Sequence, residues 1–304
     1  IAVVVFALLP RERRAAAAAW VRAHRRGVLI GAVVLVLAAY PLACGVLWLV
    51  QDRLIHYPTR VVRATPERIG LAYRDVTLTT ADGERIAALF VPHPQPRAAV
   101  LYCHGNSGNL GDRLPTLRVL HAAGATVLAF DYRGYGRSQG RVSRAGTIRD
   151  GHAALDYALS RPDIETSHIF FYGQSLGGAV AAVVAAERAE VRAVVLESTF
   201  SSYRRIAARH LRKVLMTDVL AWPLACGLVS SGYEPREAVG RIAPRPVLVL
   251  AGTNDSICFA ELNRELFEAA GEPKRYVEIA GGEHLSLLEQ DGDKVRRAIL
   301  EWLK

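Results

Sequence analysis

The sequence has few sulfur-containing residues, with four cysteines and one methionine among 304 residues. No CxxC pair and no zinc-ligand spacing occurs among the cysteines, which are Cys44, Cys103, Cys226 and Cys258. So few cysteines in a chain of this length argue against both a disulfide scaffold and a cysteine-based metal protein. We interpret them as small apolar residues, and a bridge between Cys226 and Cys258 stays open if the compartment is oxidising.

Acidic residues are fewer than basic ones, which gives a formal net charge of +9 from 38 Lys and Arg against 29 Asp and Glu. The excess is concentrated at the N-terminal end. Residues 1–60 hold eight arginines against Glu12 and Asp52, a net charge of +6, and the remainder holds 30 basic and 27 acidic residues, a net charge of +3. A nucleic-acid-binding domain needs a concentrated basic surface. The distribution therefore argues against nucleic acid as a partner.

One stretch lacks charged side chains altogether: residues 27–50, a run of 24 residues. As a helix it spans about 36 Å, more than a hydrocarbon core of about 30 Å, and Pro41 kinks such a helix without preventing insertion. Buried helices of soluble proteins are rarely so long, and a signal peptide has a shorter apolar core and a small-residue cleavage site. Residues 1–60 are therefore predicted to form a basic segment and an uncleaved single-pass transmembrane anchor.

The arginines around this stretch predict its orientation. Six precede it and only two follow it closely, namely Arg11, Arg13, Arg14, Arg22, Arg25 and Arg26, and then Arg53 and Arg60. By the positive-inside rule, the N-terminal side is cytoplasmic and the bulk of the chain lies on the non-cytoplasmic side. The chain begins with Ile1 rather than Met, and residues 1–9 are apolar. Both features fit a fragment whose upstream part is missing, and for such a fragment more than one span stays open.

From residue 75 onward, short apolar runs alternate with turns and amphipathic stretches. Eight runs are predicted to be strands: VTLTT, RIAALFV, AAVLYC, ATVLAFD, HIFFYG, RAVVLE, PVLVLAG and RYVEIA. A hairpin turn at residues 81–83 joins the first two, and helices are predicted at residues 114–123, 143–160, 175–188, 260–270 and 286–303. Residues 61–304 are thus predicted to form one α/β domain with an eight-stranded, mostly parallel sheet covered by helices.

Residues 200–235 interrupt this alternation, because the segment is too long for a simple connection. We predict a small helical cap there. It mixes leucine, valine and tryptophan with five basic residues: Arg204, Arg205, Arg209, Arg212 and Lys213. Such a surface suits contact with lipid headgroups while an acyl chain enters beneath it, and it equally suits an ordinary cap with a solvated basic face.

A nucleophile elbow is predicted at residues 168–178, HIFFYGQSLGG. The β-branched and aromatic run ends in the pattern Gly-x-Ser-x-Gly around Ser175, and a helix of small residues follows. Glycine is needed on both sides because side chains there collide with neighbouring backbone. The turn exposes the Ser175 hydroxyl, and the backbone N–H of Leu176 at the helix N-terminus is a candidate oxyanion donor.

An activated serine needs a base, and a carboxylate that orients the base. His284 lies in a Gly-Gly-Glu-His turn after the last predicted strand, and Asp255 lies in the turn after the seventh. Serine, acid and histidine follow in this order in α/β-hydrolases. We therefore predict Asp255 as the acid, with Glu197 at the end of the sixth strand as the alternative.

A glycine-rich loop, HGNSGN at residues 104–109, follows the third predicted strand. The second oxyanion donor of an α/β-hydrolase comes from this loop, and the backbone N–H of Asn106 is the candidate. We interpret His104 as a residue that braces the loop through a hydrogen bond rather than as a second base.

Five motifs carry a family resemblance: HGNSGNLGDR, AFDYRGYGRSQG, GQSLGGAVA, LESTF, and AGTNDS with GGEH. Over residues 50–303 the chain resembles the membrane-anchored α/β-hydrolases of the Bem46/ABHD13-like group. The resemblance implies an α/β-hydrolase fold, a serine hydrolase activity and one N-terminal span. It also implies that Ser175, Asp255 and His284 occupy the triad positions and that Asn106 and Leu176 occupy the oxyanion positions. The cap departs most from the family, so substrate identity does not carry over.

These residues predict acyl transfer to water, by a serine esterase acting on a small-molecule or lipid ester or thioester. The chemistry needs no metal and no organic cofactor. The same triad serves a serine aminopeptidase-like peptidase and a protein depalmitoylase, so both stay open as alternatives. A membrane-tethered scaffold without turnover is the alternative outside the enzymes. The expected partners are the ester substrate and the membrane.

Overall fold

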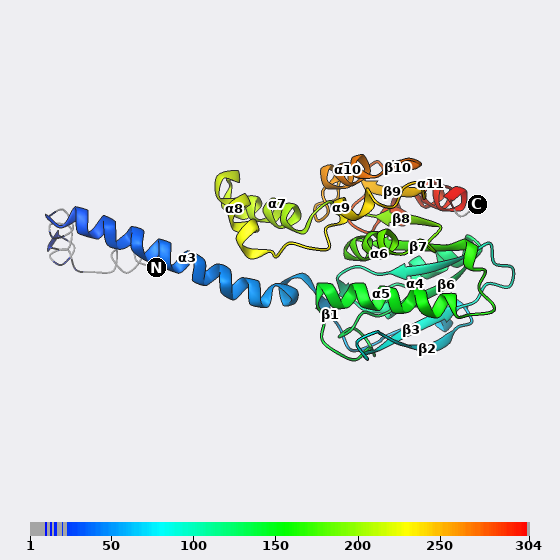
Figure 1. Cartoon of the computed structure of the whole chain (residues 1–304). Helices are drawn as coiled ribbons and strands as arrows, with labels where there is room; N and C mark the ends of the chain where they lie inside the picture. The colour runs from blue at the N-terminus through cyan, green and yellow to red at the C-terminus, as the bar shows by residue number, and fades with distance from the viewer. Residues whose placement is uncertain (1–9, 11–12, 14, 17–19, 21–22, 303–304) are drawn as a thin grey trace. The chain divides into compact units, whose positions relative to one another are not determined.

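The computed structural model describes residues 10, 13, 15–16, 20 and 23–302, and the chain divides into two compact units between residues 49 and 50. Helix α3 (Arg25–Ile55) begins in the first unit, and its last turn belongs to the second (Figure 1). The helix is 31 residues long. Its most apolar stretch of 18 residues has a mean hydropathy of 2.4, and none of these residues is buried. Among the described residues it is the one helix long and apolar enough to cross a membrane, a test that a signal sequence also meets.

The predicted span, residues 27–50, lies within α3, and Pro41 is inside the helix. Its orientation and the domain boundary near residue 60 stay predictions. Residues 1–9, and three of the arginines that predict the orientation, lie outside the described residues: Arg11, Arg14 and Arg22.

The second unit is built on an eight-stranded sheet, which confirms the predicted α/β fold. Its strand order is β10-β9-β8-β7-β4-β6-β3-β2. The strands are β2 (Arg74–Thr79), β3 (Arg85–Val91), β4 (Ala98–Cys103), β6 (Ala125–Phe130), β7 (Ile169–Gln174), β8 (Ala193–Glu197), β9 (Val247–Gly252) and β10 (Lys274–Ile279). β3 pairs antiparallel with both β2 and β6, and every other pair is parallel.

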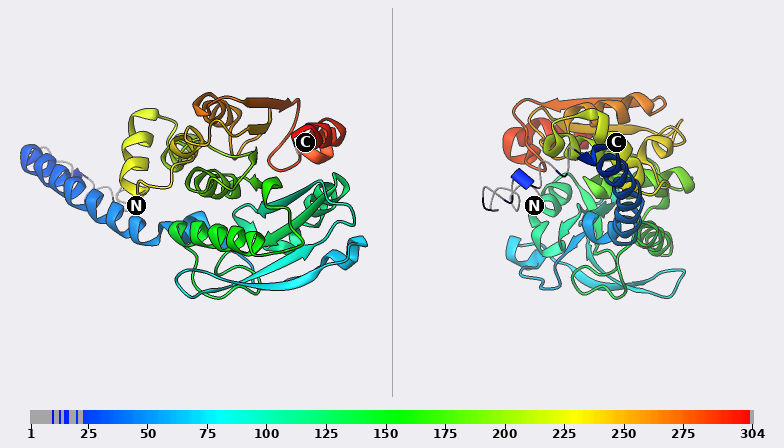
Figure 2. Two further views of the ribbon diagram at one scale, coloured as in Figure 1. Left: turned by 45° about the vertical axis from the view of Figure 1, so that its right-hand side comes forward. Right: turned by 90° about the vertical axis from the view of Figure 1, so that its left-hand side faces the viewer.

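Helices cover both faces of this sheet (Figure 2). One apolar core lies under α5 (Arg144–Leu159), α6 (Leu176–Glu187), α9 (Pro235–Val239) and α10 (Ala260–Ala269), and the other lies under α4 (Leu114–Ala122) and α11 (Leu287–Trp302). Every residue of β4, β6, β7, β8 and β9 is buried, as expected for central parallel strands. The loops at the carboxyl ends of these strands meet at one edge, where such sheets bind their ligands.

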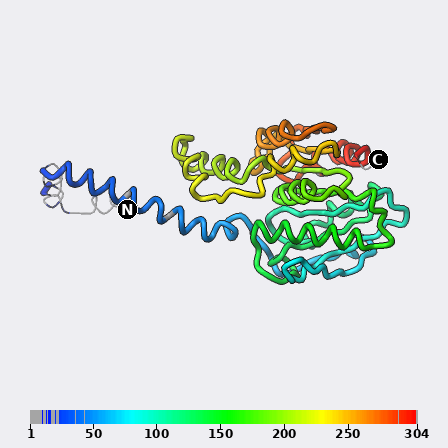
Figure 3. Tube along the Cα trace, viewed as in Figure 1, coloured from blue at the N-terminus to red at the C-terminus, as the bar shows by residue number. Residues whose placement is uncertain are grey.

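Between β8 and β9 the chain forms a helical hairpin, α7 (Tyr203–Leu215) and α8 (Asp218–Leu228), which can be followed in Figure 3. Met216 ends α7 with a φ of 56°, in the left-handed region. The Thr217 side chain then caps α8 by accepting a hydrogen bond from the backbone N–H of Val219. The cap predicted for residues 200–235 is therefore built mainly from these two helices.

Short elements complete the second unit. They are the paired strands β1 (Tyr57–Pro58) and β5 (Ser107–Gly108), and the 3₁₀ helices η1 (Pro66–Ile69), η2 (Leu110–Asp112) and η3 (Thr166–His168). Two-residue strands carry no periodicity, so the sequence did not predict the pair. All four cysteines lie in the described part of the chain and are free, so the bridge left open between Cys226 and Cys258 is absent.

Candidate active site

Ser175 lies in a strained turn between β7 and α6. Its φ of 54° and ψ of −117° are backbone angles that non-glycine residues adopt rarely, mostly at functional sites. The turn needs glycine at two positions because neighbouring backbone atoms lie too close there for a side chain. A Cβ atom on Gly173 would lie 2.4 Å from the carbonyl oxygen of Gly177, and one on Gly177 would lie 2.0 Å from that of Cys103. The structure thus contains the turn that the glycine pattern predicts.

Asp255 and His284 are brought together by the loops after β9 and β10. His284 Nδ1 lies 2.9 Å from Asp255 Oδ2, and Asp255 Oδ1 accepts backbone hydrogen bonds from Ile257 (2.9 Å) and Cys258 (2.8 Å). Burial by itself raises the pKa of Asp255, but the hydrogen bond and charge of His284, with the two backbone N–H groups, bring the pKa below its ordinary value. An ionised carboxylate accepts a hydrogen bond from the Nδ1–H group, which leaves Nε2 of the neutral ring as the basic nitrogen.

The Ser175 hydroxyl contacts a thiol in this structure. Its Oγ lies 3.7 Å from Cys258 Sγ, and in the described part of the chain no hydrogen bond joins Ser175 to His284. Burial raises the pKa of the Cys258 thiol, so this neighbour is uncharged. Serine–histidine contacts in free enzymes are often long and shorten only when substrate binds. The candidate acid and base are therefore in contact with each other, and the serine hydroxyl lies next to a neutral thiol.

The glycine-rich loop after β4 lies next to Ser175, because a Cβ atom on Gly105 would lie 3.5 Å from Ser175 Cβ. Within the described residues, no protein acceptor is hydrogen-bonded to the backbone N–H of Asn106 or of Leu176. Both groups can therefore donate to an oxyanion formed at the serine. His104 is buried, and its Nδ1 lies 2.6 Å from the Gly105 carbonyl oxygen, a contact that suits the predicted bracing role.

Asn106 is held by the last residue of helix α3, by the start of β1 and by Tyr135. Its side-chain amide donates to the Ile55 carbonyl (3.0 Å), and its own carbonyl accepts from the Tyr57 N–H (2.8 Å) and from the Tyr135 hydroxyl (2.6 Å). The last turn of α3 and the start of β1 therefore fix the conformation of the candidate oxyanion residue.

Glu197, the alternative acid, is buried at the end of β8 and hydrogen-bonds other partners. Its Oε2 accepts hydrogen bonds from the Tyr172 hydroxyl and from the Gln174 side-chain amide (2.8 Å). The side-chain oxygen of Gln174, Oε1, in turn accepts a hydrogen bond from the Tyr102 hydroxyl. Burial raises the pKa of Glu197, and the hydrogen bonds from Tyr172 and Gln174 only partly oppose this effect. The structure brings Asp255, and not this carboxyl group, into hydrogen-bond contact with His284.

The chain is similar to proteins of known sequence and structure. Residues 94–224 match the family model described as serine aminopeptidase, S33. An uncharacterized protein of Mycobacterium tuberculosis is 36% identical over 261 residues, which cover 84% of this chain and 89% of that protein. Bem46 of Schizosaccharomyces pombe is 31% identical over 254 residues, which cover 79% of this chain and 81% of Bem46. The chain belongs to the Bem46-like α/β-hydrolases.

The fold of this Bem46-like hydrolase is also that of a solved esterase. The esterase of Pyrococcus furiosus superposes with a TM-score of 0.69 at 21% identity, over 82% of this chain and 97% of that one. At this identity the likeness concerns the fold alone. It confirms the predicted hydrolase architecture.

Three features of the Bem46-like site were missed by sequence reasoning. Gln174 is the variable residue of Gly-x-Ser-x-Gly, and its polarity within a buried strand was a usable signal for the contact with Glu197. Cys258 carried no signal, because its place beside Ser175 depends on how the Asp255 loop folds. The contacts of Asn106 with residues 55–57 join segments far apart in sequence, so no local pattern indicates them.

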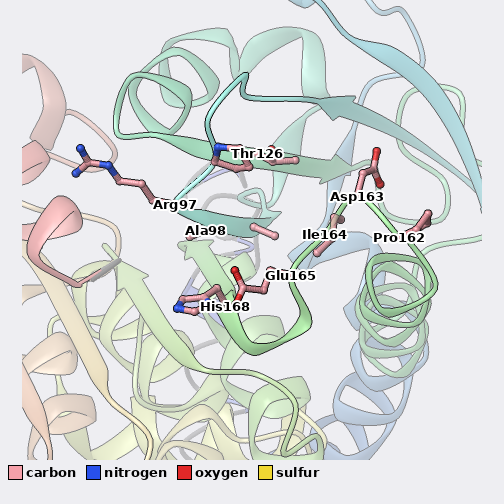
Figure 4. A pocket seen from close by; sticks show the side chains of 10 residues that line it. Arg97, Ala98, Thr126, Pro162, Asp163, Ile164, Glu165 and His168 are labelled. Carbon is pink, nitrogen blue, oxygen red and sulfur yellow. Dashed lines mark ion pairs between the residues drawn. The ribbon is translucent and has the colours of Figure 1, made fainter.

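A cavity of about 250 Å³ lies at the other end of the sheet (Figure 4). Its lining includes the starts of β4 and β6 and the loop before β7, with Arg97, Ala98, Thr126, Asp163, Glu165 and His168. The carboxylates there are already paired, Asp163 with Arg161 and Glu165 with His168 (3.1 Å). Because it lies at the amino ends of these strands, this cavity does not belong to the candidate site.

Proposed function

We propose that the chain is a serine hydrolase that cleaves a carboxylic ester or thioester through Ser175, His284 and Asp255. The observation that carries the proposal is the hydrogen bond of 2.9 Å between Asp255 and His284, at the sheet edge where the strained elbow presents Ser175. Neither a metal nor an organic cofactor enters this chemistry.

The mechanism follows from the groups at this edge. His284 Nε2 takes the proton of the Ser175 hydroxyl, and the alkoxide attacks the acyl carbonyl carbon. The backbone N–H groups of Asn106 and Leu176 stabilise the negative oxygen that develops. His284 then protonates the leaving alcohol or thiol, and a water molecule, activated by the same imidazole, releases the acid and regenerates the serine. Asp255 stays ionised and holds the ring in the productive tautomer.

A peptidase acting at an amino terminus is the second candidate, because the matching family model is described as serine aminopeptidase. Its substrate carries a positive amino group, which calls for an unpaired carboxylate near the serine. The carboxylates that α10 presents to the cap are paired, Glu265 with Arg205 and Glu261 with Arg209. These two carboxylates are therefore not free to bind an amino group. An ester or a thioester, which includes the acylated cysteine of a depalmitoylase substrate, needs no such carboxylate.

The test uses the full chain and its Ser175→Ala variant. A fluorophosphonate probe should label the wild type and not the variant, and only the wild type should hydrolyse p-nitrophenyl esters. Parallel assays with acyl thioesters and amino-acid anilides rank the substrate classes. An unlabelled wild type, or a variant with wild-type turnover, would refute the serine mechanism, and preferred cleavage of the anilides would favour the peptidase.

We further propose that α3 anchors the protein in a membrane, with its N-terminal side cytoplasmic and the catalytic domain on the non-cytoplasmic side. The length and hydropathy of α3 support the anchor, and the arginine distribution supports the orientation. The full chain should resist carbonate extraction. Protease added from the non-cytoplasmic side should digest the domain, and digestion from the cytoplasmic side alone would invert the topology.

A further inference from the structure

An exposed apolar surface lies at the turn between α7 and α8. We call it the cap tip, and it consists of Val214, Met216, Val219, Leu220 and Trp222, whose exposed fractions are 79%, 86%, 78%, 55% and 49%. After α3, the described residues expose nine large apolar side chains, and five of these nine are in the cap tip. Scattered apolar side chains are normal on a protein surface, but a group of five is the kind of patch that marks an interaction site.

The cap tip has no packing partner within the described part of the chain. Helix α8 packs mainly against α7, with Ala221 and Ala225 buried on its inner face. A stable interface with a second copy normally involves about 20–30 residues of each partner, so a patch of five side chains is small for a dimer.

Most basic residues of the cap form ion pairs or hydrogen bonds with other parts of the second unit, whereas, within the described residues, the cap tip does not. Arg205 and Arg209 form ion pairs with two carboxylates of α10, and Lys213 Nζ donates to the Ser256 carbonyl (3.0 Å). Arg212 pairs with Asp218 at 3.2 Å across the base of the turn, and both side chains are half-exposed or more. The turn therefore exposes five apolar side chains beside one ion pair, while Arg205, Arg209 and Lys213 are held by contacts elsewhere, an arrangement that suits shallow insertion into a bilayer.

The first residues of the second unit contact the base of this hairpin. Gln51 Oε1 accepts hydrogen bonds from the backbone N–H and the hydroxyl of Ser230, which follows α8 directly, and from the Arg144 side chain. Gln51 belongs to the second unit and comes immediately after the proposed anchor, residues 27–50. The last residue of the proposed anchor is therefore joined directly to a residue that contacts the base of the cap.

We propose that the cap tip inserts into the lipid bilayer. Valine, methionine and leucine enter the acyl boundary, Trp222 suits the interface, and Arg212 and Lys213 lie behind them at headgroup level. From the hairpin an apolar cluster leads back to the serine, through Val229, Phe200, Cys258 and Leu176. If the proposed function holds, the substrate is an acyl ester or thioester taken from the membrane.

The direct test measures the depth of the cap tip in full-length protein reconstituted in phosphatidylcholine vesicles. An environment-sensitive fluorophore is attached to Val219→Cys, with Cys44→Ala and Cys226→Ala to remove the two partly exposed native thiols. The matched control carries the label on Glu165→Cys, a 73% exposed side chain at the amino end of β7. Lipids with a spin label on the acyl chain should quench the fluorophore at 219 and not at 165.

Each other outcome overturns the proposal. Equal emission with and without spin-labelled lipid at both positions places the tip in water. Quenching at both positions would show that contact with lipid is not specific to the cap tip. A shielded label at 219 that lipid does not quench, together with cross-linking between copies, makes a second copy of the chain the occupant.

The functional arm uses a variant with Val214→Ser, Met216→Ser and Val219→Ser. Hydrolysis of a long-chain ester presented in vesicles should fall about tenfold or more, whereas hydrolysis of p-nitrophenyl acetate should stay unchanged. Val61→Ser, at an exposed valine outside the cap, is the control and should change neither rate. Equal losses on both substrates would contradict membrane delivery through the tip. If no ester is cleaved and the fluorophosphonate probe does not react, the proposed function fails, and the depth measurement still decides the insertion.

Discussion

The end of β8 and the loop after β9 each bury a carboxyl group at the same edge of the sheet, and the pKa values of the two groups are shifted in opposite directions. Burial raises the pKa of Glu197, whose hydrogen bonds come from uncharged tyrosine and amide groups. Asp255 is also buried, but a histidine and two backbone N–H groups lower its pKa. What separates the two sites is therefore the donors that surround each group, because both carboxyl groups are desolvated.

This difference separates two roles that the sequence left open between the two residues. A carboxylate that orients a histidine must be ionised while the imidazole is charged. A group whose environment favours the neutral form suits a packed interior, where Glu197 links the strand of the nucleophile to the adjacent strand through Gln174. On the proposed mechanism, Asp255 acts in catalysis and Glu197 supports the elbow.

The largest expected effect is that of Asp255→Asn. The amide cannot hold the productive histidine tautomer, so kcat should fall about 10³- to 10⁴-fold with the fold intact. Steady-state kinetics on p-nitrophenyl acetate, with circular dichroism as the folding control, measure this change. If Glu197→Gln lowers kcat by more than Asp255→Asn, with both proteins folded, the roles of the two carboxyl groups are exchanged.

The next effect concerns stability at Glu197. Glu197→Ala leaves the Tyr172 hydroxyl and the Gln174 amide without their acceptor in a buried place, which should lower the free energy of unfolding by about 2–4 kcal/mol. Glu197→Gln keeps the shape and an acceptor oxygen, and at pH 4.5, where the wild-type group is largely protonated, it should lose about 1 kcal/mol or less. Urea unfolding of the full chain in detergent compares the two. Equal losses would mean that the negative charge matters more than the hydrogen bonds.

A smaller effect is the pH dependence of stability, which should have opposite signs at the two groups. The pKa of Asp255 is lowered by folding, so its stabilising contribution is present above pH 3.8 and is lost as the pH falls through the folded pKa. The pKa of Glu197 is raised by folding, so its contribution is present below pH 4.5 and is lost as the pH rises through the folded pKa. Glu197→Gln should therefore gain stability relative to wild type between pH 4.5 and neutrality. A constant difference across that range would show that the Glu197 pKa does not change on folding.

The smallest expected effect is that of Cys258→Ala, which removes the thiol beside the Ser175 hydroxyl. The neutral thiol takes no part in the proposed proton transfer, so kcat should change by about threefold or less. Pre-steady-state acylation by p-nitrophenyl acetate measures the serine step directly. A loss comparable with that of Asp255→Asn would make Cys258 part of the catalytic machinery.

Much of the fold followed from local patterns. The eight strands, the hairpin of β2 and β3 and the turn at Ser175 were predicted because periodicity, turn residues and close-packed glycines act over a few neighbouring residues. The order of serine, acid and histidine made Asp255 and His284 candidates, and the structure brings them into contact. Their catalytic roles stay predictions. The contacts of Asn106 with residues 55–57 join distant segments and had no local signal, and for Glu197 the only signal was the polarity of Gln174 within a buried strand.

The sequence by itself determined the elements of this protein: an uncharged helix long enough for a bilayer, buried parallel strands, and a serine in a turn that only glycine neighbours allow. These depend on side-chain pattern and on steric limits within a few residues. Only the tertiary structure decided which carboxyl group meets His284 and which sides of the cap are occupied. A charge or an apolar surface is neutralised, buried or left exposed by neighbours that the fold brings from elsewhere in the chain. The sequence therefore contains the basic and apolar residues of the cap, but it does not indicate that the basic residues pair with α10 while the tip stays exposed.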